Sequence, residues 1–143
     1  MKITIDLNVV LDVVQNRAPH YTDSADVLSR ARTGEMAGVL PAHAITTIYY
    51  LVAKARDRAA ADSAIEMLLE HFDIIPADKR TFQAARQLKF RDFEDSVVAA
   101  MAQASACDYI VTRNVQDFAG SPVPALTPAD FLALLPQVPA AQP

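Results

Sequence analysis

The sequence predicts an α/β protein built on a mostly parallel, roughly five-stranded sheet with helices on both faces. Short apolar runs alternate along the chain with stretches whose apolar residues recur at helical spacing. This alternation favours parallel strands, because each needs a helix-sized connection to the next. The chain also has only 3 glycines and no tryptophan, which argues against a loop-rich all-β fold.

Five short segments have the composition of strands. In chain order they are residues 2–6, 36–42, 73–77, 107–114 and 122–128. The first is rich in β-branched residues, which favour strands, and the fourth ends on polar residues. The last contains prolines, which a sheet tolerates at its edge, so we expect this strand to lie at one side of the sheet.

Seven segments have the apolar spacing of helices. In chain order they are residues 8–16, 21–35, 42–58, 60–72, 79–89, 93–106 and 131–135. Gly34 stops the second helix, and Asp78 can cap the fifth. Thr127 and Pro128 form a cap and a first turn for the last helix, with Asp130 as the capping-box partner.

Length, composition and charge exclude several classes of protein. With 143 residues, the chain has room for one domain, which we expect over residues 1–135 with a frayed tail over 136–143. The single cysteine, Cys107, cannot form an intramolecular disulfide or a thiolate zinc site by itself. No apolar stretch approaches the ~20 residues of a membrane span, and no signal peptide is recognisable, so we expect a soluble cytoplasmic protein without membrane contact.

The formal net charge of −4 bears on nucleic-acid binding. Proteins that hold nucleic acid by charge alone are usually basic, so this balance counts against a simple nucleic-acid clamp. It does not count against a nuclease whose acidic residues bind metal ions, because the metal ions reverse the local charge.

Acidic residues stand at the strand ends where a parallel sheet binds its ligands. Asp6 ends the first strand, and Asp117 follows the polar end of the fourth strand, residues 112–114. Asp92 and Asp95 begin the helix before that strand and share a helix face. Carboxylates that converge resist ionisation unless a cation lies between them, and Mg²⁺ or Mn²⁺ prefers such oxygen ligands. A metal held there can activate water and stabilise the charge that develops on a phosphodiester.

Several of these acidic residues also have structural explanations. Asp92 alone is better explained as a helix cap, because acids favour the first turn of a helix. Asp117 can equally cap a short turn, whereas Asp95 is favoured as a functional residue. Glu94 should point away from Asp95 and lie on the surface, and His43 is more often a structural or surface residue than a ligand.

Three polar residues near these acids remain open to two interpretations. Asn8 can cap the first helix or can hydrogen-bond Asp6 and orient it. Asp12 is expected to be solvated or paired with Arg17. Arg113 is either a surface residue or a contact for substrate phosphate, and the sequence is compatible with both roles.

Three motifs together resemble the PIN domain family, and most closely its VapC-like, toxin-type members. They are "IDLNVVLD" at 5–12, "DFEDSVVAAMA" at 92–102 and "DYIVTRNVQDF" at 108–118. The resemblance covers nearly the whole chain. It implies a three-layer α/β/α sandwich and a metal-dependent endoribonuclease, in which acidic residues hold Mg²⁺ or Mn²⁺ and a metal-activated water attacks RNA.

The family's site residues map onto this chain by motif. Asp6, Asp95 and Asp117 match its three acids, Asp92 matches an additional acid of some members, and Thr112 and Asn114 match polar positions that line the site. The chain departs from the pattern at Thr47, where the family usually has glutamate. A neutral hydroxyl contributes no charge to a metal, though it can hold a metal-bound water.

Two functions of different class follow from these residues. The leading hypothesis is a metal-dependent endoribonuclease that is the toxin of a toxin–antitoxin pair, with RNA as substrate, an antitoxin protein as partner and a homodimer as assembly. The alternative is a PIN-like module that binds RNA or a protein with weakened catalysis. Thr47 and the acidic net charge motivate this alternative.

Overall fold

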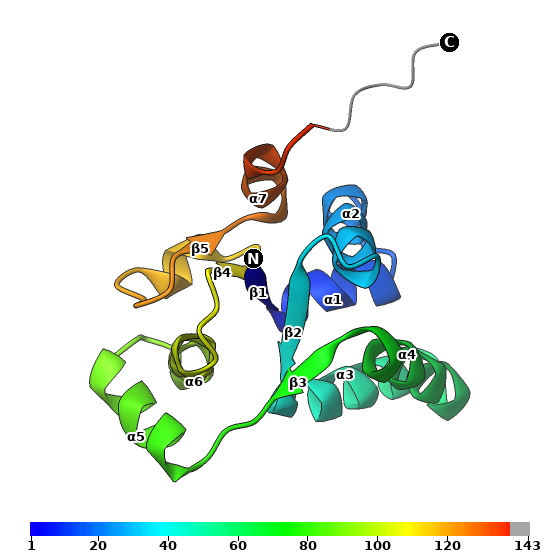
Figure 1. The fold of residues 1–143 in the computed structure, drawn as a ribbon. Helices are drawn as coiled ribbons and strands as arrows, with labels where there is room; N and C mark the ends of the chain where they lie inside the picture. Colours follow the sequence, from blue (N-terminus) through cyan, green and yellow to red (C-terminus); the bar gives the residue numbers. More distant parts are fainter. Residues whose placement is uncertain (138–143) are drawn as a thin grey trace.

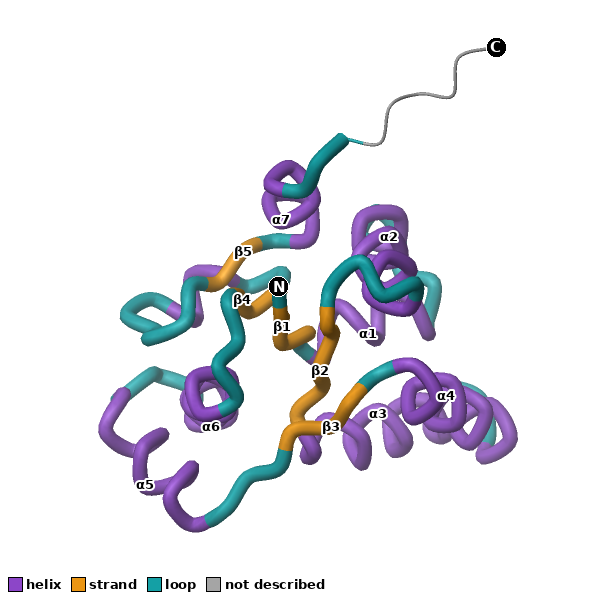
Figure 2. Tube along the Cα trace, viewed as in Figure 1, coloured by secondary structure: helices purple, strands orange, loops and turns teal. Residues whose placement is uncertain are grey.

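The centre of the protein is a parallel sheet. The computed structural model describes residues 1–137, and within them five strands form one sheet of order β3-β2-β1-β4-β5 (Figures 1 and 2). The strands are β1 (Lys2–Ile5), β2 (Ala37–Pro41), β3 (Asp73–Ile75), β4 (Tyr109–Val111) and β5 (Ala125–Leu126). Every neighbouring pair is parallel, which confirms the predicted sheet and its proline-flanked edge strand β5.

The helices lie on both faces of this sheet (Figure 1). They are α1 (Leu7–Val14), α2 (Tyr21–Arg32), α3 (Ala42–Ala55), α4 (Arg58–His71), α5 (Lys79–Leu88), α6 (Phe93–Ala104), the 3₁₀ helix η1 (Val115–Phe118) and α7 (Pro128–Leu134). One apolar core joins the sheet to α1, α2, α3, α4 and α7, and a second joins it to α5, α6 and η1. The three-layer sandwich is therefore confirmed.

The central strand supplies side chains to both faces, as a strand's two-residue period requires. Ile3 and Ile5 of β1 are fully buried in the first core, whereas the hydroxyl of Thr4 donates to the Sγ of Cys107 at 3.2 Å. On the other face, α6 buries every residue from Ser96 to Ala102. Alanines occupy much of this stretch, so the helix can pack closely on the sheet.

Capping residues set the starts of several helices, and the structure decides between the two interpretations of Asn8. Asp78 accepts a hydrogen bond from the backbone N–H of Thr81, and Thr127 caps α7 with Pro128 in its first turn, as predicted. The cap of α1 is Asp6 rather than Asn8, because the helix begins one residue earlier than its apolar pattern suggests. The acid that ends β1 therefore also starts the next helix.

No helix in residues 1–137 is long and apolar enough to cross a membrane. Of the predicted tail, residues 138–143 lie outside the described part of the chain.

Candidate active site

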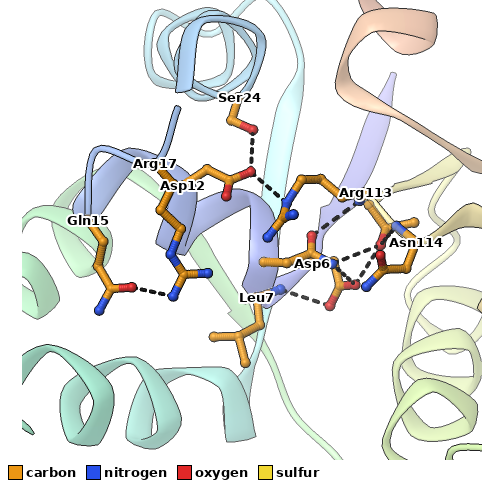
Figure 3. Close-up of polar contacts among 10 residues, drawn as sticks. Asp6, Leu7, Asp12, Gln15, Arg17, Ser24, Arg113 and Asn114 are labelled. Carbon is orange, nitrogen blue, oxygen red and sulfur yellow. Dashed lines mark hydrogen bonds and ion pairs between the residues drawn. The ribbon is translucent and has the colours of Figure 1, made fainter. Parts of the chain in front are cut away.

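Asp6 is held at the carboxyl end of β1 by its neighbours on two elements (Figure 3). Ile5 pairs with Val111 across β1 and β4, so the residues that follow, Asp6 and Thr112, lie side by side. The Thr112 hydroxyl donates to Oδ2 of Asp6 at 2.8 Å, and the backbone N–H of Leu7 donates to Oδ1 at 2.8 Å. Only 8% of Asp6 is exposed, so its carboxylate is fixed in position.

Asn8 ties the start of α1 to the end of β4. Its side-chain amide donates to Oδ2 of Asp6 at 3.4 Å and to the Thr112 hydroxyl oxygen at 3.3 Å. Its carbonyl oxygen accepts from the backbone N–H of Arg113 at 3.2 Å, and the N–H of Asn114 donates to Thr112 at 3.1 Å. Asn8 therefore has the orienting position that was one of its two predicted roles.

Negative charge accumulates around Asp95, on the first turn of α6. Burial raises the pKa of Asp95 to about 7, together with repulsion from the carboxylates of Asp92, Asp6, Asp117 and Glu94. The structure thus brings the predicted acids Asp6, Asp92 and Asp117 close enough to Asp95 to raise its pKa. Burial also raises the pKa of Asp6, against the hydrogen bonds from Thr112 and Leu7 that lower it.

Asp92 and Asp117 border a common pocket. Asp92 is the N-cap of α6 and accepts from the backbone N–H of Glu94 at 2.8 Å, so its predicted capping role is confirmed. Asp117 is exposed on η1. Together with Arg91 and Phe93, these two acids line an open pocket of about 520 Å³.

The chemistry of this set of residues fits a hard divalent cation. The side chains that repel Asp95 are all carboxylates, and Mg²⁺ and Mn²⁺ prefer oxygen ligands. Burial and repulsion from these carboxylates together raise the pKa of Asp95, and a cation among them would offset both effects. Within residues 1–137, no three His, Cys, Asp or Glu side chains are already grouped closely enough to hold a metal ion.

Thr47 directs its hydroxyl into its own helix. The hydroxyl lies 3.3 Å from the backbone carbonyl oxygen of His43, one turn earlier in α3, and donates to it. The Nε2 of His43 lies 3.7 Å from the Oε1 of Glu94, so α3 and α6 meet beside the acids. Glu94 is exposed, as predicted. Its negative charge nevertheless adds to the effect of burial in raising the pKa of Asp6 and of Asp95.

The prediction for Asp12 is wrong. Asp12 is fully buried; its Oδ2 accepts from the Ser24 hydroxyl at 3.1 Å and lies 2.9 Å from the Nε of Arg113 (Figure 3). Arg17 donates to the side chain of Gln15 instead. Asp12 faces α2 and the end of β4, and a helical pattern in α1 alone does not reveal which elements will cover it. Arg113 is thereby anchored, with 25% of its side chain exposed.

Comparison with known proteins gives one family and one curated relative. The family model described as PIN domain matches residues 2–116. A protein named Ribonuclease VapC1, from Aquifex aeolicus (strain VF5), is 26% identical over 135 residues, which cover 91% of this chain and 92% of that protein.

Solved structures of low sequence identity share the fold. VapBC2 from Rickettsia felis, bound to a DNA fragment from its promoter, matches with a TM-score of 0.72 at 15% identity, over 89% of this chain and 98% of that one. VapC20 from Mycobacterium tuberculosis, described as a toxin that cleaves the sarcin–ricin loop, matches with a TM-score of 0.63 at 10% identity, over 76% and 86%.

Proposed function

This chain belongs to the PIN domain family, and on that premise we propose that it is a metal-dependent endoribonuclease that hydrolyses RNA phosphodiesters. The proposal rests on the carboxylate of Asp6, which Thr112 and Asn8 hold at the carboxyl end of β1. It rests also on the pKa of Asp95, which burial and repulsion from Asp92, Asp6, Asp117 and Glu94 raise to about 7. Perturbed carboxylates in one cleft are typical of catalytic or metal sites. The relative named as a ribonuclease supports the same activity.

Asp6, Asp95 and Asp117 are the residues that would hold Mg²⁺ or Mn²⁺, with Asp92 as an additional acid. When bound, such an ion supplies an activated water and stabilises the charge that develops on the phosphodiester. The protein's own residues hold the Asp6 carboxylate in place. The Thr112 hydroxyl and the Asn8 amide fix Oδ2 of Asp6, and burial excludes water from most of that carboxylate.

Cleavage by purified protein tests this function. We expect the wild type to cut single-stranded RNA in Mg²⁺ or Mn²⁺ and to stop when a chelator is added. Asp6→Asn should lower the rate by at least about 100-fold, because even residues that only support metal ligands cost 10- to 100-fold. If the wild type cuts no RNA with either metal, the proposal is wrong.

We further propose that the protein is the toxin of a toxin–antitoxin pair, acting on cytoplasmic RNA as a homodimer. Several of its structural neighbours are VapBC or toxin–antitoxin complexes, which supports a protein partner. Expression should arrest growth, and co-expression of a small neighbouring reading frame should relieve the arrest. Light scattering measures the mass of the purified protein in solution. We expect twice the mass of one chain, as a homodimer requires.

A second function, RNA or protein binding with weakened catalysis, is favoured by one observation. The Thr47 hydroxyl donates to the His43 carbonyl oxygen, so this position adds neither charge nor a free donor to the acids. A band-shift assay with Mn²⁺ separates the two functions. Retained but uncut RNA supports the binding module, whereas release of shorter fragments supports the nuclease.

A further inference from the structure

We propose that the pocket lined by Arg91, Asp92, Phe93 and Asp117 binds one unpaired nucleotide of the RNA beside the cleaved phosphodiester. Phe93 would stack on the base, and Arg91 would contact a phosphate. This inference rests on the proposed ribonuclease function and adds the substrate contact that the acids themselves cannot provide.

The pocket lies between two segments that aromatic packing holds together. One wall is the start of α6 with the residue before its cap, and the other is η1. Phe90, just before the first wall, packs edge-to-face on Phe118 of η1, with ring centroids 6.2 Å apart and planes at 85°. Phe118 is buried, so this contact sets the spacing of the walls. Asp92 and Asp117 therefore line one pocket from two different elements.

Phe93 is an aromatic side chain that the core does not use. It is the first residue of α6, it is 51% exposed, and it lines this pocket beside two acids. The N-cap of Asp92 fixes the backbone at this point, so the ring is carried on a rigid support. An exposed aromatic ring beside a phosphodiester-cleaving site is suited to stacking on an unpaired base, because every base has a π-face.

Arg91 supplies the positive charge that a phosphate needs next to these acids. It is exposed, lines the same pocket, and has no ion-pair partner within 4.0 Å among residues 1–137. A ring for the base and a guanidinium for the phosphate together match one nucleotide. A paired base would hide its face in the helix stack, so the pocket selects single-stranded RNA.

Because the sequence contains no tryptophan, a single introduced tryptophan is the only source of indole fluorescence and reports stacking directly. In Phe93→Trp, we expect single-stranded RNA to quench the fluorescence, with Ca²⁺ present as a hard cation for the carboxylates. The matched control is Phe82→Trp, because Phe82 on α5 is similarly exposed, at 44%, and does not line the pocket. Its fluorescence should not change. Equal quenching in both proteins, or none in Phe93→Trp, overturns the proposal.

Cleavage kinetics give a second test. Phe93→Ala should raise KM by roughly 5- to 150-fold with little change in kcat, which is the cost of one lost stacking contact. Phe93→Tyr should retain the wild-type KM, whereas Phe93→Leu, apolar but without a ring face, should not. Arg91→Gln should reduce the slope of log affinity against log salt by about 0.7, the value for one phosphate contact on a single strand.

The outcomes separate this inference from the proposed function. Wild-type cleavage with an unchanged KM in Phe93→Ala overturns the nucleotide pocket and leaves the ribonuclease intact. Fluorescence quenching in Phe93→Trp with no cleavage by the wild type supports the pocket and overturns the ribonuclease.

Discussion

At the scale of single residues, the hydrogen bonds to Asp6 determine how its carboxylate is presented. Thr112 makes the shortest side-chain contact with it, and burial leaves little room for water to replace that donor. We predict that Thr112→Val lowers RNA cleavage by about 10- to 100-fold, the usual cost of removing a residue that supports a metal ligand. Thr112→Ser keeps the hydroxyl and should retain most activity. Equal losses in both variants would show that packing, rather than the hydrogen bond, is responsible.

Asp95 gives the metal-free protein a characteristic pH dependence. Its pKa of about 7 in the folded protein lies above its ordinary value of 3.8. The folded protein therefore keeps this proton at pH values where the unfolded chain has released it. The free energy of unfolding should fall as the pH rises from about 4 to about 7 and stay lower above that.

Chemical denaturation at several pH values measures this dependence. Asp95→Asn should lack this contribution, so its stability should fall less over the same range. Adding Mn²⁺ at pH 8 should stabilise the wild type, because the metal binds the folded protein. Identical pH profiles for the wild type and Asp95→Asn would contradict this account of the acids.

At the scale of elements, buried Asp12 connects three parts of the fold. It lies on α1, accepts from Ser24 of α2 and pairs with Arg113 beyond β4. Removal of one partner from a buried ion pair lowers the free energy of unfolding by about 3–5 kcal/mol. Because Arg113 is partly exposed, we predict that the loss in Asp12→Ala lies near the lower end of this range.

Urea denaturation measures this loss of stability. Asp26→Ala is the matched control, because Asp26 pairs with Arg30 on the more exposed face of α2 and such pairs contribute about 0–1 kcal/mol. A loss in Asp12→Ala no larger than that in Asp26→Ala would show that the buried pair does not hold these elements together.

The five strands and the seven α-helices could be predicted from the sequence, because their apolar periods are strong, whereas the short 3₁₀ helix η1 has no such period. Residues 93–106 are predicted to form a helix with small buried residues, and α6 buries Ala99, Ala100 and Ala102 in the core it shares with the sheet. The pairing of Asp6 with the end of β4 could also be predicted, since parallel strands end at one edge. The contacts of Asp12 with Arg113, and of Glu94 with His43, could not be predicted. Each joins side chains from elements whose relative rotation no local pattern encodes.

At the scale of the whole molecule, a protein of net charge −4 concentrates part of that charge at one edge of its sheet. The strand order places β1 and β4 side by side, so Asp6 meets Thr112, and α6 and η1 bring the other acids. A fold that gathers repelling carboxylates at a ligand-binding edge is understandable if a cation joins them. Metal binding is thus the central claim on which the proposed cleavage depends.

Calorimetric titration with Mn²⁺ tests that claim most directly. We predict a binding heat for the wild type at pH 8 that disappears in Asp95→Asn. The heat should persist in Asp78→Asn, because Asp78 only caps α5. No heat for the wild type at millimolar Mn²⁺, or equal heats in all three proteins, would contradict a metal site at these acids.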